Sequence, residues 1–573
     1  MLCALGLLAG CQDLGSTGIT GTDDGGAESD AADGRDLAHI AADGGVADSG
    51  VRDAAGRDSG SASDGGNDGG ASDGGASDGG SGGGASDGGT VPPGDLGPST
   101  CGNGTQQWAV RAATKLNTSS GNLILRDVSV RPDGDIWVTG TLSGAATFGE
   151  GTAYQQTLTG GDGILVARYA SDGTFRWGRV WQSAYNSFAS GTQIRALADG
   201  GAMVVASFEA TVKLDAGLAS EVSFTAAGGT SDYDLVLARL AADGHVVWAR
   251  QAGGGGQDFP QALDVTPDGK SVLVGRFADA FAHDVTVSRG RPDAITRTAA
   301  STAWETLFLA QYDASGNLGW VSLAGGTSRD DEGRGVVYLG DGSVVLSGSF
   351  TSDMAFDGLA TTYTGAYGAR GFFVARWSHT GAISWARVLP TGARGSTVAL
   401  GPDGALWVLV HTSGTAVFGK GESTETTLTG SGNDAIARYD LAGNFLGVAT
   451  FATSSALHDL PSMVLIGNSA YLGGDEYYDI TFATTPNATT VSSVGWEDAI
   501  TLCASAGGQV GWWKRAGSNQ HDYVHAVAAT PNGELVTVGE YDAPLTFSPG
   551  SPGAVTLAKE ALFSESFLAR YGP

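Results

Sequence analysis

Basic residues, cysteine and long apolar runs are all scarce in this sequence, and each shortage excludes a class of protein. Lys and Arg number 31 against 61 Asp and Glu, so the formal net charge is −30. A nucleic-acid binder needs a basic face, and docking on anionic lipid needs clustered cations, so this balance argues against both. No apolar run reaches the roughly 18 residues that a membrane-spanning helix needs. Four Cys are too few for a disulfide-rich scaffold.

Helical patterns and catalytic motifs are missing as well. No apolar stripe of helical period runs for ten residues or more, and the 93 Gly are about twice the usual share. HExxH, CxxC and P-loop motifs are absent from the sequence, and GxSxG occurs only in the Gly/Ser/Asp run of residues 63–89, where no strand or helix pattern would form a nucleophile elbow. The sequence therefore predicts no catalytic residue, no metal site and no cofactor. The one cluster among eight scattered His is His521, Asp522 and His525, which we interpret as turn chemistry rather than as a metal or acid–base site.

Aromatic residues are absent from residues 12–100. This segment holds 16 Asp and one Glu against three Arg, and no Phe, Trp or Tyr. A chain of this composition cannot bury enough apolar surface to offset its ordering entropy. Residues 63–89 are a Gly/Ser/Asp run whose Asp spacing fits no calcium-binding loop. The sequence predicts a disordered tether over residues 11–100.

The first ten residues, MLCALGLLAG, form a short apolar run that ends in small residues before Cys11. Leu8-Ala9-Gly10-Cys11 resembles the lipobox of bacterial lipoproteins, although no Lys or Arg precedes the apolar run. The resemblance implies that residues 1–10 are a signal peptide and that Cys11 carries the lipid that anchors the protein in a membrane. It places the protein outside the cytoplasm, and Gln12 favours the outer membrane or cell surface of a Gram-negative bacterium.

From residue 106 onward the chain repeats itself. The copies read ILVARYASDG (164–173), LVLARLAADG (235–244), LFLAQYDASG (307–316), FFVARWSHTG (372–381), DAIARYDLAG (434–443), AITLCASAGG (499–508) and SFLARYGP (566–573). The equivalent positions 168, 239, 311, 376, 438, 503 and 570 are separated by 71, 72, 65, 62, 65 and 67 residues. Each unit contains four strand signals separated by Gly-containing turns. This pattern predicts an all-β fold, a seven-bladed β-propeller of four-stranded antiparallel blades over residues 101–573.

The last copy ends before its fourth, Trp-bearing strand. That strand occurs instead at the start of the folded region, as Gln106-Gln107-Trp108-Ala109-Val110-Arg111. We therefore expect the N-terminal strand to complete the last blade, which would close the ring.

The repeats resemble the SBBP-type repeats of bacterial seven-bladed propellers, with units of the form W-A-x-x-x-G-G…D. The best examples are WARQAGGGGQD (248–258), WVSLAGGTSRDD (320–331) and WKRAGSNQHD (513–522). The resemblance covers residues 106–573 and implies a propeller fold and an extracytoplasmic setting, without a settled activity.

Propeller topology assigns candidate binding residues to two places. Long loops, where binding often resides, are expected over residues 143–163, 209–234, 278–306, 351–371 and 411–433. The candidate contact residues in these loops are Tyr154, Trp304, Tyr363 and Tyr367, and Tyr185 is a further candidate in the loop after the first blade. The first strand of each blade lines the central channel, where the candidates are Arg126, Arg195, Gln261, Arg334 and His525, with Ser396 and Pro461 at matching positions. These residues predict either a funnel for a carboxylate-bearing ligand or solvated channel walls.

Two further sets of residues have structural interpretations. Asp258, Asp331 and Asp522 recur three residues before channel positions and are expected to accept backbone N–H groups in turns. Cys101 and Cys503 are candidates for a disulfide that joins the root of the tether to a neighbouring blade.

These features predict an anchored, monomeric propeller that acts as a non-enzymatic binding or adhesion module for a glycan or protein partner. Two alternatives remain: a carbohydrate-active enzyme with carboxylates at the channel mouth, and an envelope-assembly scaffold.

Overall fold

The structure is a computed structural model. The structure describes residues 101–573 except residues 115–120, 184–187, 279–283, 300–304, 328–329, 366–367, 454–456, 484–487, 550–552, 562 and 573. The chain divides into two units, residues 1–87 and 88–573, and all described residues belong to the second. Cys11 and the predicted tether lie outside the described residues.

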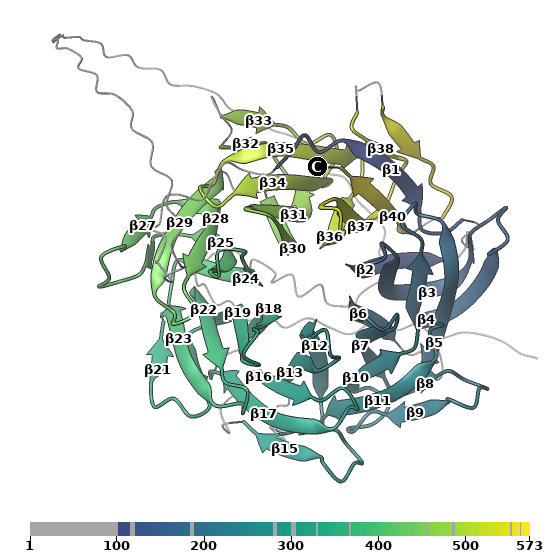
Figure 1. The fold of residues 1–573 in the computed structure, drawn as a ribbon, viewed down its shortest axis with the longest axis horizontal. Coiled ribbons are helices and arrows are strands. Elements are labelled where there is room, and N and C mark those ends of the chain that lie inside the picture. Colours follow the sequence, from purple (N-terminus) through teal and green to yellow (C-terminus); the bar gives the residue numbers. More distant parts are fainter. Residues whose placement is uncertain are drawn as a thin grey trace, which may run out of the picture. The chain divides into compact units, whose positions relative to one another are not determined.

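The described residues contain strands and turns but no helix. The strands form antiparallel groups of four in chain order, and Figure 1 shows these groups following one another around a common centre. The first groups are β2 (Asn122–Val130), β3 (Ile136–Phe148), β4 (Gln156–Tyr169) and β5 (Phe175–Ser183); β6 (Ala189–Ala196), β7 (Ala202–Glu209), β10 (Tyr233–Leu240) and β11 (Val246–Gly253); and β12 (Gln257–Val265), β13 (Ser271–Ala278), β16 (Thr306–Tyr312) and β17 (Leu318–Gly325). The next are β18 (Glu332–Tyr338), β19 (Val344–Thr351), β22 (Arg370–Trp377) and β23 (Ile383–Leu389); β24 (Ala393–Leu400), β25 (Leu406–Ser413), β28 (Ser431–Tyr439) and β29 (Phe445–Thr453); and β30 (Leu457–Ile466), β31 (Ser469–Glu476), β34 (Asp498–Ser505) and β35 (Val510–Gly517).

The last group takes its fourth strand from the start of the folded region. Its strands are β36 (Asp522–Ala529), β37 (Leu535–Tyr541), β40 (Glu565–Tyr571) and β1 (Gln106–Arg111). Strand β1 is antiparallel to β40, with Trp108 opposite Arg570 and Val110 opposite Leu568. The innermost strands β2, β6, β12, β18, β24, β30 and β36 each contact the next, and β36 also contacts β2.

The connections between second and third strands contain short hairpins. They are β8 (Thr211–Leu214) with β9 (Val222–Thr225), β14 (Asp284–Val287) with β15 (Ile295–Thr298), β20 (Asp353–Phe356) with β21 (Thr362–Thr364), β26 (Ala416–Phe418) with β27 (Thr426–Leu428), β32 (Ile480–Phe482) with β33 (Thr489–Val491), and β38 (Leu545–Phe547) with β39 (Val555–Leu557). Strands β8, β14, β20, β32 and β38 pair with the outer strand of the preceding group. The connections expected as long loops are therefore largely sheet, because their backbone groups complete a neighbouring sheet edge.

The first group forms its hairpin differently. Strands β3 and β4 extend beyond the length of the other second and third strands and stay paired to Phe148 and Gln156. Thr147 in this extension exchanges two backbone hydrogen bonds, of 2.7 and 2.8 Å, with Thr114, which follows β1. The extended hairpin thus contacts the segment that directly follows the outer strand of the last group.

The hydrophobic core lies between successive groups. Trp137 of the first group packs with Phe208 of the second, and both are fully buried. Another cluster joins Leu125 of the first group to Val538 and Leu568 of the last. Each buried cluster draws on two neighbouring groups in this way, so burial of apolar surface, at about 25 cal/mol per Å², stabilises the contact between groups as well as each group.

The repeated Arg of the third strand joins one group to the next. Guanidinium groups of Arg168, Arg239, Arg376 and Arg570 donate to the carbonyl oxygens of Ala242, Ala314, Leu441 and Ser171, at 3.0, 2.9, 2.7 and 2.5 Å. The same four side chains form ion pairs with Asp135, Asp199, Asp341 and Glu534 in the turn after the first strand. The motif that revealed the repeat therefore encodes a contact between groups.

The repeated Trp of the fourth strand has a matching role. The rings of Trp108, Trp177, Trp248, Trp320 and Trp385 lie against Gly173, Gly244, Gly316, Gly381 and Gly443, each in a tight turn of the next group. These Gly have φ between 76° and 84°, where a side chain is strained, and a Cβ would also meet the Trp ring. The described residues thus form an all-β structure of antiparallel four-stranded sheets, as expected of a β-propeller.

Candidate functional site

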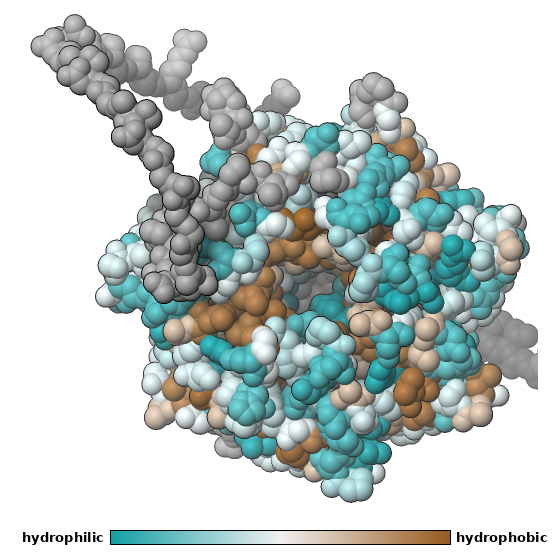
Figure 2. Space-filling model, in the orientation of Figure 1, coloured by the Kyte–Doolittle hydropathy of each residue, from teal (hydrophilic) through white to brown (hydrophobic). Residues whose placement is uncertain are grey.

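The candidate channel residues lie at irregularities in the innermost strands. Pairing in these strands skips Arg126, Thr192, Gln261, Arg334 and His525, and skips residues 396–397 and 460–461 in two others. Such bulges re-aim side chains and occur often beside binding sites. Figure 2 shows that this face is hollowed at its centre, with hydrophilic and hydrophobic surface both around the hollow.

In the second group, the bulge does not lie at the predicted channel residue, Arg195. Thr192, rather than Arg195, is the residue that the pairing of β6 skips, because the register slips between Gly191 and Gln193. Arg195 lies three residues further along β6. The gap in the second repeat hid this shift from the sequence pattern.

Three of the candidate cations face carboxylates of the protein itself. Nη1 of Arg195 lies 2.6 Å from Oδ2 of Asp127 on β2. Nη2 of Arg334 lies 2.8 Å from Oε2 of Glu332. These carboxylates largely neutralise the positive charge that a carboxylate-bearing ligand would need. His525 is also buried and lies beside an acid, since its Nε2 is 3.3 Å from Oε1 of Glu540 on β37.

A glycine on the second strand makes room for several of these bulges. A Cβ at Gly140, Gly348 or Gly539 would lie 1.9 Å from the carbonyl oxygen of Ile124, Glu332 or Tyr523. No side chain fits so close to a backbone oxygen, so the Gly of the repeated second-strand motif is required by the bulge opposite it.

Two of the five candidate loop aromatics lie within the described residues. Tyr154 is 46% exposed and carries the guanidinium of Arg176 4.7 Å from its ring centroid. Tyr363 lies on β21, half-buried, with its ring edge-on to Phe356 at 6.3 Å between centroids. Tyr363 therefore packs under its own hairpin. Tyr185, Trp304 and Tyr367 lie outside the described residues.

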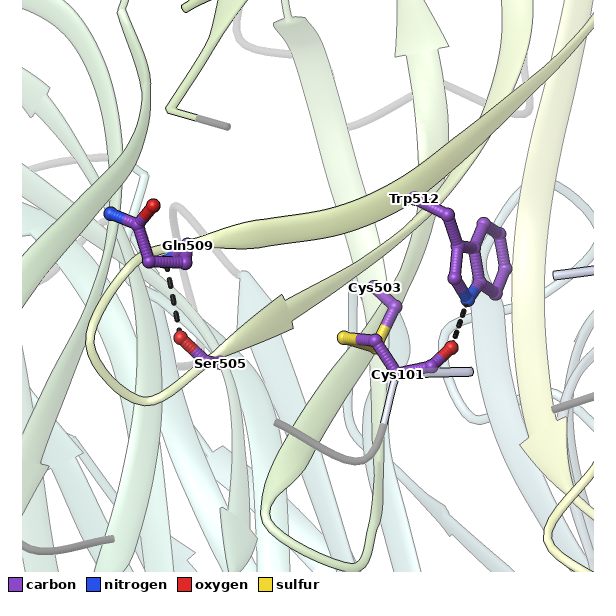
Figure 3. Close-up of a disulfide and its surroundings, with 5 residues drawn as sticks. All are labelled: Cys101, Cys503, Ser505, Gln509 and Trp512. Atoms are coloured by element: carbon purple, nitrogen blue, oxygen red, sulfur yellow. Dashed lines mark hydrogen bonds between the residues drawn. A yellow bond between two sulfur atoms is a disulfide. The ribbon is translucent and has the colours of Figure 1, made fainter. Parts of the chain in front are cut away.

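A disulfide joins Cys101 to Cys503, with 5.7 Å between the Cα atoms (Figure 3). Cys503 lies on β34 of the sixth group, and Cys101 precedes β1 of the last. The indole N–H of Trp512 on β35 donates to the carbonyl oxygen of Cys101. Both cysteines are buried. The start of the folded region is therefore covalently attached to the neighbouring group.

The recurring acids at the start of the first strands bind backbone amides, as predicted. Oδ2 of Asp258, Asp331 and Asp522 accepts the amide of Gly254, Gly326 and Ser518 at 2.6, 2.7 and 2.6 Å. Burial raises the pKa of Asp522 to about 8 and the pKa of Asp331 well above its usual range. These carboxyls hold tight turns between groups.

An aromatic cluster surrounds His521, between the sixth and last groups. Nδ1 of His521 lies 2.5 Å from Oε2 of Glu497, which also accepts a hydrogen bond from the hydroxyl of Tyr523. The ring of Trp496 lies 5.8 Å from that of His521 and is 57% exposed. The repeat pattern points to His521 but not to these partners, because Trp496 and Glu497 lie in the sixth copy, which matches the repeat least.

The described residues contain neither a set of metal ligands nor a candidate membrane-spanning helix. No set of three or more His, Cys, Asp or Glu side chains there is arranged to hold a metal ion. No helix long and apolar enough to cross a membrane occurs within the same residues.

Comparison with protein-family models and with curated proteins found no match. Among solved structures, a protein of unknown function from Bacteroides caccae is 9% identical, with a TM-score of 0.30, over 61% of this chain and 89% of that one. The endosialidase of phage phi92 is 9% identical, with a TM-score of 0.34, over 82% and 69%. YCF48 bound to D1 peptide is 13% identical, with a TM-score of 0.21, over 56% and 94%. All three scores are low, so these similarities define neither the fold nor the function of this chain.

Proposed function

We propose that this chain is a lipid-anchored extracytoplasmic protein whose residues 101–573 form a closed seven-bladed β-propeller. In this proposal the propeller acts as a non-enzymatic binding module for a glycan or protein partner. The tether of residues 11–100 would hold it at the outer membrane or cell surface.

Closure of the ring is supported by contacts that recur between the last group and the first. Strand β36 contacts β2, as each innermost strand contacts the next. Arg570 donates to the carbonyl of Ser171, as Arg168 donates to that of Ala242. Because β1 pairs with β40, the two ends of the folded region lie in one sheet.

The binding role rests on one observation above all: each innermost strand interrupts its pairing around the central hollow. A bulge leaves a residue without its ladder hydrogen bonds, and bulges commonly re-aim side chains toward a site. Most of the skipped positions carry polar side chains, among them Thr192, Gln261 and Arg334. Since Arg195 and Arg334 are neutralised by Asp127 and Glu332, a neutral partner suits this surface better than an anionic one.

The extracytoplasmic location draws support from the disulfide. Disulfides persist in oxidising compartments and are rare in the cytosol. The bond between Cys101 and Cys503 thus agrees with the export that the lipobox-like Leu8-Ala9-Gly10-Cys11 predicts.

Metabolic labelling tests the anchor. When the full chain is expressed in a Gram-negative host with labelled palmitate, the wild type should incorporate label and fractionate with membranes. Cys11→Ala should do neither. Label in the Cys11→Ala variant would refute the assignment of the anchor.

A glycan and polysaccharide array probed with the full chain in detergent tests the binding role. Retention without release of shorter saccharides would support a binding module. Bond cleavage would instead support the carbohydrate-active enzyme. Saccharide-independent co-purification of one periplasmic protein, with the chain shielded from protease in intact cells, would support the assembly scaffold.

A further inference from the structure

Three segments that lie apart in the sequence meet between the sixth and last groups. Tyr477 and Tyr478 follow β31, Trp496 and Glu497 precede β34, and His521 precedes β36. Backbone pairing holds two of the segments together, since Glu497 forms a parallel bridge with His521 and its carbonyl accepts the amide of Asp522 at 2.9 Å.

The rings of these segments form a continuous row. From Tyr478 the centroid distances are 4.4 Å to Tyr477, then 6.5 Å to Trp496, 5.8 Å to His521 and 6.3 Å to Tyr523. The outer end is open to solvent, because Tyr478 is 61% exposed and Trp496 is 57% exposed. We call Tyr477, Tyr478, Trp496, His521 and Tyr523 the aromatic row.

The inner end of the aromatic row reaches the bulge of the last group. The ring of Tyr523 stacks on that of His525, with 6.0 Å between centroids, and His525 is the residue that the pairing of β36 skips. The aromatic row therefore runs from an exposed connection toward the innermost strand, where the proposed binding surface lies.

Hydrogen bonds fix the middle of the aromatic row before any ligand arrives. Oε2 of Glu497 holds Nδ1 of His521 at 2.5 Å and accepts the hydroxyl of Tyr523. Glu497 is largely buried, whereas the side chain of His521 is 38% exposed. The bond at Nδ1 directs Nε2 of His521 to be the ring nitrogen that meets a ligand hydroxyl. A site held by such supporting contacts loses little entropy on binding.

The chemistry of the aromatic row fits an uncharged sugar chain. The negative faces of Trp and Tyr rings attract the C–H groups on the apolar face of a sugar ring, and the exposed rings of Trp496 and Tyr478 are each available to stack on one. Imidazole nitrogen and phenol groups bind sugar hydroxyls. Glu497, at the middle of the aromatic row, and the net charge of −30 oppose an acidic polysaccharide.

We propose that the aromatic row is a binding site for neutral polysaccharide, with Trp496 and Tyr478 stacking on sugar rings and His521 hydrogen-bonding a hydroxyl. This proposal rests on the binding role proposed above and names its ligand class and location.

Affinity electrophoresis and calorimetry of the full chain in detergent test the proposal. The neutral probes are laminarin, xyloglucan, arabinoxylan and galactomannan, and the acidic probes are alginate and polygalacturonate. At least one neutral probe should bind the wild type, and neither acidic probe should. Trp496→Ala should weaken binding by about tenfold or more, as truncation of a central aromatic anchor does, and Tyr478→Ala should weaken it several-fold.

Two control variants separate loss of the site from loss of the fold. Phe563→Ala removes an aromatic that is 42% exposed and lies outside the aromatic row, and this variant should bind as the wild type does. Trp496→Phe keeps a ring and should retain most of the affinity. All variants should melt at the wild-type temperature.

The remaining outcomes contradict the proposal in distinguishable ways. Unchanged binding of a neutral probe by Trp496→Ala would overturn the location while leaving the binding role intact. Binding of only the acidic probes would overturn the ligand class. If no saccharide binds, the glycan proposal as a whole is overturned. The same holds if the chain binds a protein but no saccharide.

Discussion

Arg570, on the last strand, donates from Nη1 to the carbonyl oxygen of Ser171, 399 residues earlier in the chain, at 2.5 Å. The same side chain forms an ion pair with Glu534 in the turn between β36 and β37. Arg168 makes the equivalent pair of contacts, to the Ala242 carbonyl of the second group and to Asp135 in the first-strand turn of its own group. The device that joins neighbouring repeats therefore also joins the two ends of the repeat region.

Arg570→Ala tests this contact. Both side chains of its ion pair are largely buried, so the substitution leaves Glu534 without its cation and should cost about 1–3 kcal/mol of unfolding free energy. Arg297→Ala is the matched control, because Arg297 and Asp357 are both 37% exposed, and exposed pairs contribute about 0–1 kcal/mol. Denaturant unfolding compares the two. Equal losses would contradict a special role for Arg570.

The disulfide should stabilise the folded region measurably. It closes a span of 402 residues, and such cross-links contribute on the order of 2–5 kcal/mol, mainly by restricting the unfolded chain. The double substitution Cys101→Ser with Cys503→Ser should lower the melting temperature accordingly. Reductant should lower the melting temperature of the wild type and leave the variant unchanged; a wild type indifferent to reductant would speak against the bond.

The glycine opposite a bulge should tolerate no side chain. A Cβ at Gly348 would lie 1.9 Å from the carbonyl oxygen of Glu332, so Gly348→Ala should destabilise the protein by about 1–3 kcal/mol or more. Gly414→Ala is the control, because nothing lies within 4 Å of a Cβ placed there. The melting temperatures of both variants test this prediction. A Gly348→Ala variant that melts at the wild-type temperature would contradict it, because the bulge would then have shifted to admit the Cβ.

The sequence predicted the repeat, the strands and the partner of the first strand, because each depends on spacing and turn chemistry alone. Trp108 duly lies opposite Arg570. Side-chain partners were harder to foresee. Thr192 occupies the bulge because of the register of β6 on β7 within the second group, and Asp127 neutralises Arg195 because β2 and β6 are neighbours. A gapped repeat encodes neither.

For the candidate loops too, the sequence predicted one property and not another. Their length was visible in the sequence, but the hairpins within them pair with a different group, and such pairing depends on how neighbouring groups approach. The aromatic row escaped prediction for a related reason. Tyr477, Trp496 and His521 belong to three segments, and only the fold brings them together.

Stability should fall as pH rises from about 4 to about 8, partly through Asp522. Burial raises the pKa of this carboxyl in the folded chain to about 8, whereas the unfolded chain releases the proton near the usual value of 3.8. Within this window the folded chain binds more protons than the unfolded chain, so the unfolding free energy falls with rising pH. Asp522→Asn keeps an oxygen for the Ser518 amide and should reduce the slope.

Glu476, Asp234 and Asp331 contribute to the remaining slope, because burial raises the pKa of Glu476 to about 8, that of Asp234 to about 6 and that of Asp331 well above its usual range. Asp172→Asn is the control. A hydrogen bond from the Thr174 amide holds the pKa of Asp172 below its usual range, so that variant should keep the wild-type slope between pH 5 and 8. An Asp522→Asn variant as pH-dependent as the wild type would show that Asp522 ionises normally in the folded chain.

Cross-linking of β1 to β40 tests the closed ring most directly. Val110 and Leu568 are opposite one another, and Cα atoms of such antiparallel pairs lie about 4.5–5.5 Å apart, within disulfide range. In the double variant Val110→Cys with Leu568→Cys, peptide mapping after oxidation should recover the peptides of positions 110 and 568 joined within one chain. In the control Val110→Cys with Leu446→Cys, whose second position lies on β29 of the fifth group, the two peptides should stay separate. A properly folded first variant whose two positions remain unlinked would contradict the ring.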